Sequence, residues 1–81
     1  MNYTLSKHAL DVIENRGIFL EWIAYTINHP TRKDDISPIE SHFFSTITQN
    51  DNRCLKVVIN MITLVVITVY FDRGMRKRGC K

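Results

Sequence analysis

An almost unbroken run of apolar and β-branched residues dominates the hydrophobic pattern of this chain. The run spans residues 53–71, and its only strongly polar interior positions are Lys56 and Asn60. The abundance of Val, Ile and Thr favours two buried antiparallel strands with a turn near residues 60–63. The alternative is a membrane-anchoring helix, but a helix that avoids Lys56 and Asn60 has only residues 61–71, whereas a bilayer requires roughly 20 residues.

Two short helices are predicted in the first third of the chain. The first begins after an N-cap at Thr4 or Ser6 and ends at Gly17, a residue suited to a left-handed C-cap. The second runs from Leu20 to Asn28, since Pro30 forbids its continuation. Its inner face is expected to contain Leu20, Ile23, Ala24 and Ile27. Its two aromatic residues fall outside this face and are candidates for a partner surface: Trp22 and Tyr25.

The middle of the chain alternates between turn-rich and strand-like segments. Residues 31–38 predict a loop or a poor edge strand, residues 40–48 a strand, and residues 49–52 a turn. The predicted fold is therefore α+β, with two N-terminal helices packed on one face of a three- to four-stranded antiparallel sheet. Residues 1–81 are expected to form a single domain that ends in a basic tail at about residues 73–81.

Side chains alternate between the two faces of a strand, so the pattern also predicts an open face of the sheet. On the last strand, the residues expected under the helices are Val65, Ile67, Val69 and Phe71. On the opposite face, the predicted set is His42, Lys56, Asn60, Thr68 and Tyr70. This assignment assumes regular strands, because one β-bulge would move part of each set to the other face.

Composition and charge indicate one small globular domain with a basic C-terminal part. The 81 residues are 44% hydrophobic and 23% charged. Residues 1–52 carry four Lys/Arg against seven Asp/Glu, whereas residues 53–81 carry seven Lys/Arg against Asp72 alone. This asymmetry favours contact with a polyanion through the C-terminal end, although a solvated basic tail would have the same composition.

The cysteines and the N-terminal residues bear on the compartment. Cys54 and Cys80 have no metal-ligand spacing, and two cysteines make a poor disulfide framework. The N-terminal residues lack the Lys/Arg-led apolar segment of a secretory signal. These features predict a cytoplasmic protein.

The chemistry-bearing residues suit metal-independent cleavage of RNA. The sequence lacks phosphate-binding glycine loops and the common protease, hydrolase and kinase motifs, and its basic half has too few acids for a Mg²⁺ site. RNA cleavage needs a base for the 2′-hydroxyl, an acid for the leaving 5′-oxygen and cations for the phosphorane charge. The predicted catalytic residues are His8, His42, Arg16 and Tyr70. The predicted phosphate-binding residues are Lys56, Arg73, Arg76 and Lys77, with no metal and no other cofactor.

Each of the main candidates also has a structural interpretation. His8 lies close to the apolar stripe of the first helix and is equally compatible with a packed histidine. Arg16 is compatible with capping helix carbonyls. His42 and Tyr70 are compatible with ordinary cross-strand neighbours, and Lys56 with keeping an open sheet face soluble. The pattern alone leaves both interpretations open.

Several blocks of the sequence together resemble one family of small proteins. YTLSKHALDVIENRGI, followed by EW, HP, HFF, NRCLKVVIN and VITVYFDR, is similar to the domain of unknown function 4258 family, from Tyr3 to about Arg78. That family is similar to the RelE/ParE-like toxins of the barnase–EndoU–colicin–RelE fold, which are metal-independent ribonucleases or gyrase poisons. The resemblance implies two helices on one side of an antiparallel sheet and a site on its open face. The residues that match family positions are His8, Arg16, His42, Tyr70 and Arg73.

The expected function is that of a toxin-like, metal-independent endoribonuclease of a type II toxin–antitoxin pair. Its expected partners are RNA, with ribosome association and oligomeric state left open, and a small acidic antitoxin that covers the basic sheet face. No membrane partner is expected. The alternative is a non-catalytic binding module of the same fold, which holds a protein or a nucleic acid, ParE-like gyrase inhibition included.

Overall fold

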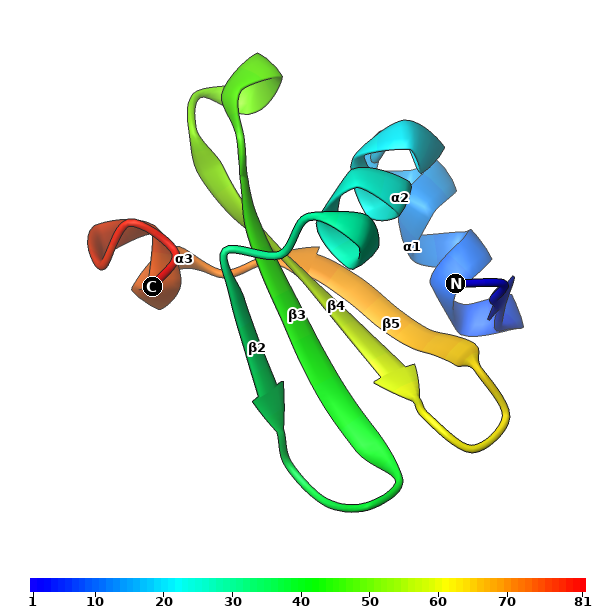
Figure 1. Ribbon diagram of the computed structural model, residues 1–81. Coiled ribbons are helices and arrows are strands. Elements are labelled where there is room, and N and C mark those ends of the chain that lie inside the picture. Colours follow the sequence, from blue (N-terminus) through cyan, green and yellow to red (C-terminus); the bar gives the residue numbers. More distant parts are fainter.

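The chain folds into a five-stranded sheet with two helices on one face and a third on the other (Figure 1). The computed structural model describes all of residues 1–81, and the strand order is β1-β5-β4-β3-β2. The strands are β1 (Thr4–Leu5), β2 (Arg32–Asp35), β3 (Glu40–Ile47), β4 (Arg53–Asn60) and β5 (Val65–Phe71). The helices are α1 (Lys7–Arg16), α2 (Leu20–Asn28) and α3 (Arg73–Lys77), with a 3₁₀ turn at Thr48–Asn50.

The α+β class predicted from the sequence is confirmed, but the sheet is mixed and not purely antiparallel. β1 runs parallel to β5, with Leu5 opposite Val66, while the other three strand pairs are antiparallel. The N–H groups of Thr4 and Ser6 donate 3.0 Å hydrogen bonds to the carbonyls of Leu64 and Val66. Because β1 has only two residues, it is too short for side-chain alternation to predict it.

The two N-terminal helices begin and end at the predicted signals. Ser6, and not Thr4, caps α1, since its Oγ accepts a 3.0 Å hydrogen bond from the Ala9 N–H. Gly17 ends α1 with a φ of 64°, in the left-handed region that glycine adopts easily, and the buried Ile18 follows it. The bounds predicted for α2 are also confirmed.

The main core lies between the layer of α1 and α2 and the sheet. Its buried members are Ala9, Ile18, Trp22, Ile23, Ile27, Phe43, Ile47, Leu55, Val57, Ile59, Val66 and Val69. The predicted inner face of α2 is partly wrong: Ile23 is buried, but Leu20 is 59% exposed and Trp22 only 9%. The helix is turned so that the large indole, and not Leu20, fills the space beside Phe71. Trp22 is therefore a core residue, whereas Tyr25 stays exposed.

A β-bulge in β5 changes the predicted faces of that strand. Val58 pairs with Thr68, but the next residue, Ile59, pairs with Val66, so Ile67 is an extra residue. The bulge places Val66 in the core, fully buried, and leaves Ile67 38% exposed. The prediction that Val65 and Ile67 lie under the helices is therefore wrong. Ile67 is the bulge residue, and Val65 pairs with Asn60 on the opposite face of the sheet. Beyond the bulge the predicted alternation resumes.

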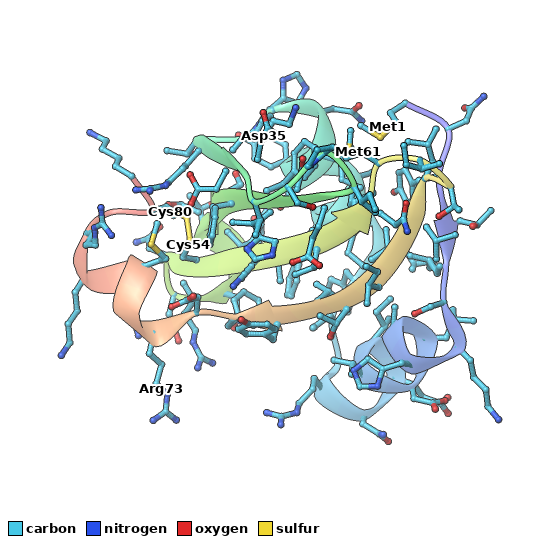
Figure 2. All side chains as sticks on the ribbon, turned by 90° about the horizontal axis from the view of Figure 1, so that it is seen from below. Met1, Asp35, Cys54, Met61, Arg73 and Cys80 are labelled. Atoms are coloured by element: carbon cyan, nitrogen blue, oxygen red, sulfur yellow. A yellow bond between two sulfur atoms is a disulfide. The ribbon has the colours of Figure 1, made fainter.

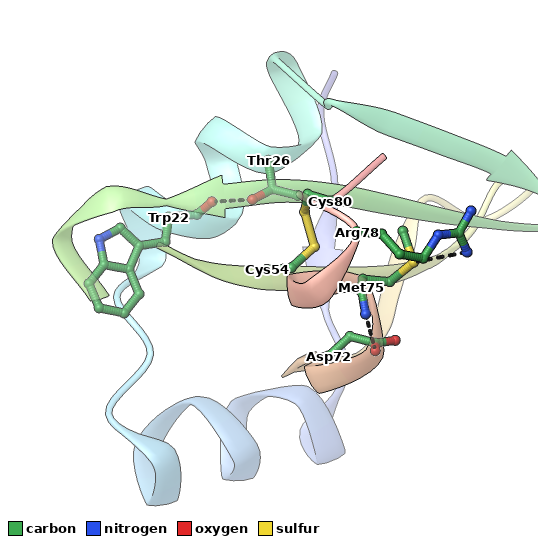
Figure 3. The surroundings of a disulfide bond; sticks show 7 residues. All are labelled: Trp22, Thr26, Cys54, Asp72, Met75, Arg78 and Cys80. Atoms are coloured by element: carbon green, nitrogen blue, oxygen red, sulfur yellow. Dashed lines mark hydrogen bonds between the residues drawn. A yellow bond between two sulfur atoms is a disulfide. The ribbon is translucent and has the colours of Figure 1, made fainter. Parts of the chain in front are cut away.

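The C-terminal residues fold against the sheet and are not only a solvated tail. Cys54 of β4 and Cys80 form a disulfide with a Cα–Cα distance of 5.6 Å (Figures 2 and 3). With Phe44 and Met75 they form a second, small buried cluster on the face opposite α1 and α2. The sequence-based argument against a disulfide is wrong, because this pairing depends on how the chain returns over the sheet. Disulfides persist mainly in oxidising compartments, so the cytoplasmic expectation loses one of its supports.

The apolar run of residues 53–71 forms β4, a turn and β5, as predicted. Asn60 closes the turn, since its Oδ1 accepts hydrogen bonds of 2.9 and 3.0 Å from the N–H groups of Ile62 and Thr63. The alternative of a membrane helix in this run is wrong, because the run is folded as strands. None of the helices has both the length and the apolar character needed to cross a bilayer.

The segment predicted as a loop or a poor edge strand contains β2, a highly charged strand at the edge of the sheet. Arg32 Nε lies 2.8 Å from Asp34 Oδ1, and Lys33 Nζ lies 3.4 Å from Asp35 Oδ1. Residues two apart share a face of a strand, so each face of β2 carries one ion pair. The two cations of this strand are therefore compensated by carboxylates of the same strand.

Replacing Ser41 with alanine is expected to raise the pKa of the Asp35 carboxyl toward its ordinary value of 3.8. The Ser41 hydroxyl donates a 2.7 Å hydrogen bond to Asp35 Oδ1, and this bond, with the neighbouring Lys33 ammonium, lowers that pKa. A lowered folded-state pKa stabilises the fold above the unfolded-state pKa, and the contribution is lost as the pH falls through the folded-state pKa. The variant should therefore lose stability at neutral pH, by an amount that shrinks in acid.

NMR titration of the Asp35 side-chain carboxyl carbon measures this change in pKa. Ser45→Ala is the matched control, because Ser45 is a buried serine of the same strand that makes no hydrogen bond to Asp35. An unchanged Asp35 pKa in the Ser41→Ala variant would contradict the assigned cause.

Candidate functional site

An open cleft lies between α1 and the outer edge of β5. Its volume is about 490 Å³, and its polar lining consists of His8, Arg16, Arg53, Thr68, Tyr70 and Arg73. Its apolar lining consists of Val12, Ile18, Val69 and Phe71. This hollow is termed the α1–β5 cleft.

The regular spacing of α1 and β5 places these side chains together. His8, Val12 and Arg16 are four residues apart and line one face of α1. β1 covers the outer edge of β5 only along its first two residues, so the cleft follows the remaining edge. At an edge both faces of a strand are accessible, which is why Tyr70 and Phe71, from opposite faces, both line the cleft.

A second groove adjoins the cleft at the end of β5. Its volume is about 370 Å³, and it shares Arg53, Phe71 and Arg73 with the cleft. Its further lining residues are Asp72, Arg76 and Lys77. The Arg73 side chain points away from the ribbon toward solvent (Figure 2). The cleft and this groove, termed the α3 groove, therefore follow one another from α1 to α3.

The cations of the two hollows have no carboxylate partners. The ion pairs of the molecule are Arg32–Asp34 and Lys33–Asp35, both on β2, and His42 contacts Glu40 on β3. Asp72 is the only acid in either lining, and its Oδ1 accepts a 3.1 Å hydrogen bond from the Met75 N–H as the N-cap of α3. The charges of Arg16, Arg53 and Arg73 therefore create a positive potential in the cleft, and guanidinium groups suit phosphate oxygens.

Tyr70 is paired with Lys56 beside the cleft. The two residues are opposite one another on β5 and β4, and Lys56 Nζ donates a 2.9 Å hydrogen bond to the Tyr70 hydroxyl oxygen. Because that oxygen acts as an acceptor, the hydroxyl proton remains available for donation to a ligand. The ammonium also lies where it would stabilise negative charge that develops on the phenol oxygen during proton donation.

Arg53 is a cleft residue that the sequence reasoning did not single out. Its guanidinium carbon lies 5.3 Å from the centroid of the Phe71 ring, which holds a planar cation where the cleft meets the α3 groove. Strand alternation contained a signal for it. Arg53 is in phase with the buried Leu55 and Val57, so it lies on the helix side of β4 and not on the open face.

The structure brings most of the predicted site residues together and separates one. The α1–β5 cleft contains His8, Arg16, Tyr70 and Arg73, the α3 groove contains Arg76 and Lys77, and Lys56 adjoins through Tyr70. His8 is exposed and not packed in the core. His42 lies on β3, two strands from β5 and so roughly 10 Å away across the sheet, with its Nε2 2.7 Å from Glu40 Oε2. The cleft therefore contains a single histidine.

The donor set of the cleft suits an anionic ligand. Its polar groups are guanidinium, imidazole, phenol and hydroxyl groups, which donate hydrogen bonds to anionic oxygens directly. Three or more His, Cys, Asp or Glu side chains do not gather anywhere in the molecule in an arrangement that could hold a metal ion. The direct binding of a phosphate by side chains is therefore the chemistry that these residues support best.

Comparison with known proteins identifies one family. The family model DUF4258, described as a domain of unknown function, matches residues 5–71. This range includes α1, β4 and β5, which form most of the cleft, but it ends before α3. No curated protein and no solved structure gives a significant match.

Proposed function

Because the chain belongs to the DUF4258 family, a family of unknown function, we propose its activity from its own geometry. We propose a metal-independent endoribonuclease that holds one RNA strand along the α1–β5 cleft and the α3 groove. The observation that supports it most is that cations without carboxylate partners surround a histidine and a lysine-bound tyrosine. Cations bind the phosphates of RNA, and imidazole and phenol groups transfer protons.

In the proposed reaction, His8 acts as the base and Tyr70 as the acid. His8 removes the proton from a 2′-hydroxyl, whose oxygen attacks the neighbouring phosphorus. The bond from phosphorus to the 5′-oxygen breaks, and Tyr70 protonates that oxygen. The products are a 2′,3′-cyclic phosphate and a 5′-hydroxyl, and exchange with water restores both side chains. Arg16 and Arg73 stabilise the phosphorane charge.

Incubation of the purified protein with a fluorescent single-stranded RNA in excess EDTA tests this activity. The expected result is cleavage to fragments that end in a 2′,3′-cyclic phosphate, which electrophoresis and mass spectrometry identify. The same oligonucleotide with 2′-O-methyl groups is the matched control, since it lacks the attacking hydroxyl and should bind without being cleaved. If the protein bound both oligonucleotides and cleaved neither, the proposed enzyme would be wrong and a non-catalytic binding module would be the better assignment.

We further propose that this ribonuclease is a RelE/ParE-like toxin whose partner is a small acidic antitoxin. The support is electrostatic, because an acidic partner would compensate the positive potential around the cleft and exclude RNA from it. α3 already covers part of the sheet face opposite α1 and α2, so the proposed contact lies at the cleft and the α3 groove. We expect a neighbouring reading frame that encodes a short acidic protein. The purified product should bind this chain and prevent it from binding RNA.

Replacing Arg16 or Arg73 with alanine is expected to weaken RNA binding and to make it less sensitive to salt. Each substitution removes a cation that would displace one counterion, so the slope of log K against log salt should fall by about 0.7 per lost phosphate contact. Fluorescence anisotropy at several salt concentrations measures both quantities. Arg32→Ala is the matched control, because Arg32 is paired with Asp34 on the far edge strand. An equal effect of all three substitutions would indicate non-specific charge attraction only.

A further inference from the structure

Few contacts outside α3 itself hold this short helix against the sheet. Met75 inserts into the small cluster with Phe44, and Arg76 donates a 3.0 Å hydrogen bond to the Asp51 carbonyl. The third connection is the Cys54–Cys80 disulfide, which lies beside the helix (Figure 3). At its start, the N-cap residue Asp72 also donates a 2.8 Å hydrogen bond from its N–H to the Cys54 carbonyl, and the remaining hydrogen bonds of the segment are local. Isolated helices of five residues are not stable in water, so the placement of α3 depends on these few connections.

The same helix supplies a large part of the positive charge of the site. Arg73 lines both hollows, and Arg76 and Lys77 line the α3 groove together with Arg53. Arg53 is fixed independently by β4 and by the Phe71 ring. When α3 is in place, cations from two distant parts of the chain therefore converge on one groove. When α3 is free, Arg53 remains and the three α3 cations are spread over a flexible segment.

We propose that the Cys54–Cys80 disulfide is a redox latch that controls the affinity of the site for polyanions. The oxidised form holds α3 in place, so that the α3 groove is complete before a ligand arrives. The reduced form releases α3, and an RNA strand must then order the released cations at an entropic cost that weakens binding. This inference rests on the proposed function, because it concerns the regulation of the same phosphate-binding site.

The chemical step is a thiol–disulfide exchange with a small dithiol or a protein dithiol. The thiolate of the reductant attacks one sulfur of the disulfide and forms a mixed disulfide, while the other protein sulfur leaves and takes a proton. The second thiol of the reductant then displaces the remaining protein sulfur. Two electrons pass to the protein, which ends with two thiols, and the reductant ends as a disulfide. Because Cys54 and Cys80 are almost completely buried, attack requires α3 to move aside first.

Binding of a fluorescent 12-nucleotide 2′-O-methyl RNA, which cannot be cleaved, tests the latch. The dissociation constant is measured by anisotropy after oxidation and after reduction with dithiothreitol, with the state of the cysteines confirmed by mass spectrometry. Reduction is expected to weaken binding about tenfold, in keeping with the cost of ordering two or three long side chains. The salt slope should also fall, by about 0.7 for each α3 cation that no longer contacts a phosphate.

The double variant Cys54→Ala/Cys80→Ala is the matched control, since it should bind like the reduced protein whether or not dithiothreitol is present. Trypsin digestion gives a readout without RNA, because release of α3 exposes Arg73, Arg76 and Lys77 to cleavage. Equal affinity of the oxidised and reduced proteins, or equal resistance of α3 to trypsin, would overturn the latch alone. Failure of both forms to bind the oligonucleotide would overturn the proposed function and its regulation together.

Discussion

Replacing His8 with alanine is expected to slow RNA cleavage by about 10²–10⁴-fold, the usual contribution of a positioned acid or base. His8 is the single histidine of the α1–β5 cleft, and the same face of α1 presents Arg16 two turns away. A positioned imidazole is the side chain that most often accepts a proton in general base catalysis. RNA affinity should change little, because the phosphate contacts are made by cations. Single-turnover cleavage and anisotropy separate the two effects.

The two other histidines of the chain provide controls for this prediction. His29 lies at the end of α2 beside Tyr25 and is exposed, so His29→Ala should cleave like the wild type. His42 was an equal candidate in the sequence. It lies on β3, two strands from β5 and the cleft, where its imidazole contacts Glu40 of the same strand. His42→Ala should therefore also retain cleavage. A loss in His42→Ala as large as in His8→Ala would reinstate a two-histidine mechanism. Full activity of His8→Ala would remove the proposed base.

Replacing Trp22 with alanine is expected to lower the free energy of unfolding by roughly 3–5 kcal/mol, the usual cost of truncating a buried aromatic residue. The indole is 9% exposed, and its ring lies 4.6 Å from Phe19 and 6.1 Å from Phe71, measured between centroids. Since small domains have about 5–15 kcal/mol of stability, this loss is a large fraction of the total. Urea unfolding followed by circular dichroism measures it.

The matched control for Trp22→Ala is Tyr25→Ala, three residues along the same helix. Tyr25 is 51% exposed, so its removal should change the stability by at most about 0.5 kcal/mol. Trp22 also supports the site, because it packs on Phe71, whose ring holds Arg53. A milder substitution, Trp22→Phe, should therefore keep the fold but weaken RNA binding. Similar unfolding curves for Trp22→Ala and Tyr25→Ala would show that the indole is not a core element.

The elements that the sequence predicted correctly are those with local signals. Ser6 and Gly17 are cap residues, and Pro30 prevents the second helix from continuing, so the bounds of α1 and α2 followed from short stretches of chain. The strands β3, β4 and β5 followed from β-branched residues and a turn. Pairing between distant segments was not accessible in this way. The parallel β1, the extra residue Ile67 and the Cys54–Cys80 disulfide all depend on contacts made only in three dimensions.

In the candidate site too, the features with local signals were predicted and those that depend on tertiary packing were not. Helical spacing placed His8 and Arg16 on one face, and strand alternation placed Lys56 and Tyr70 together, and the structure has both arrangements. The position of that face of α1 at the edge of β5 could not be predicted, because helix placement depends on packing over the whole core. The predicted open face therefore suggested one site with His42 in it, whereas the cleft lies at the edge of the sheet.

The charged pattern of β2 bears on how copies of this protein meet one another. A free sheet edge is normally a template for pairing with another chain. Docking a second strand on this edge would crowd Arg32, Lys33, Asp34 and Asp35, two of each sign on each molecule, and would strip water from them. At the other edge, β1 offers two residues, too few for a stable ladder. The charged border at β2 thus discourages the edge-to-edge pairing of two copies.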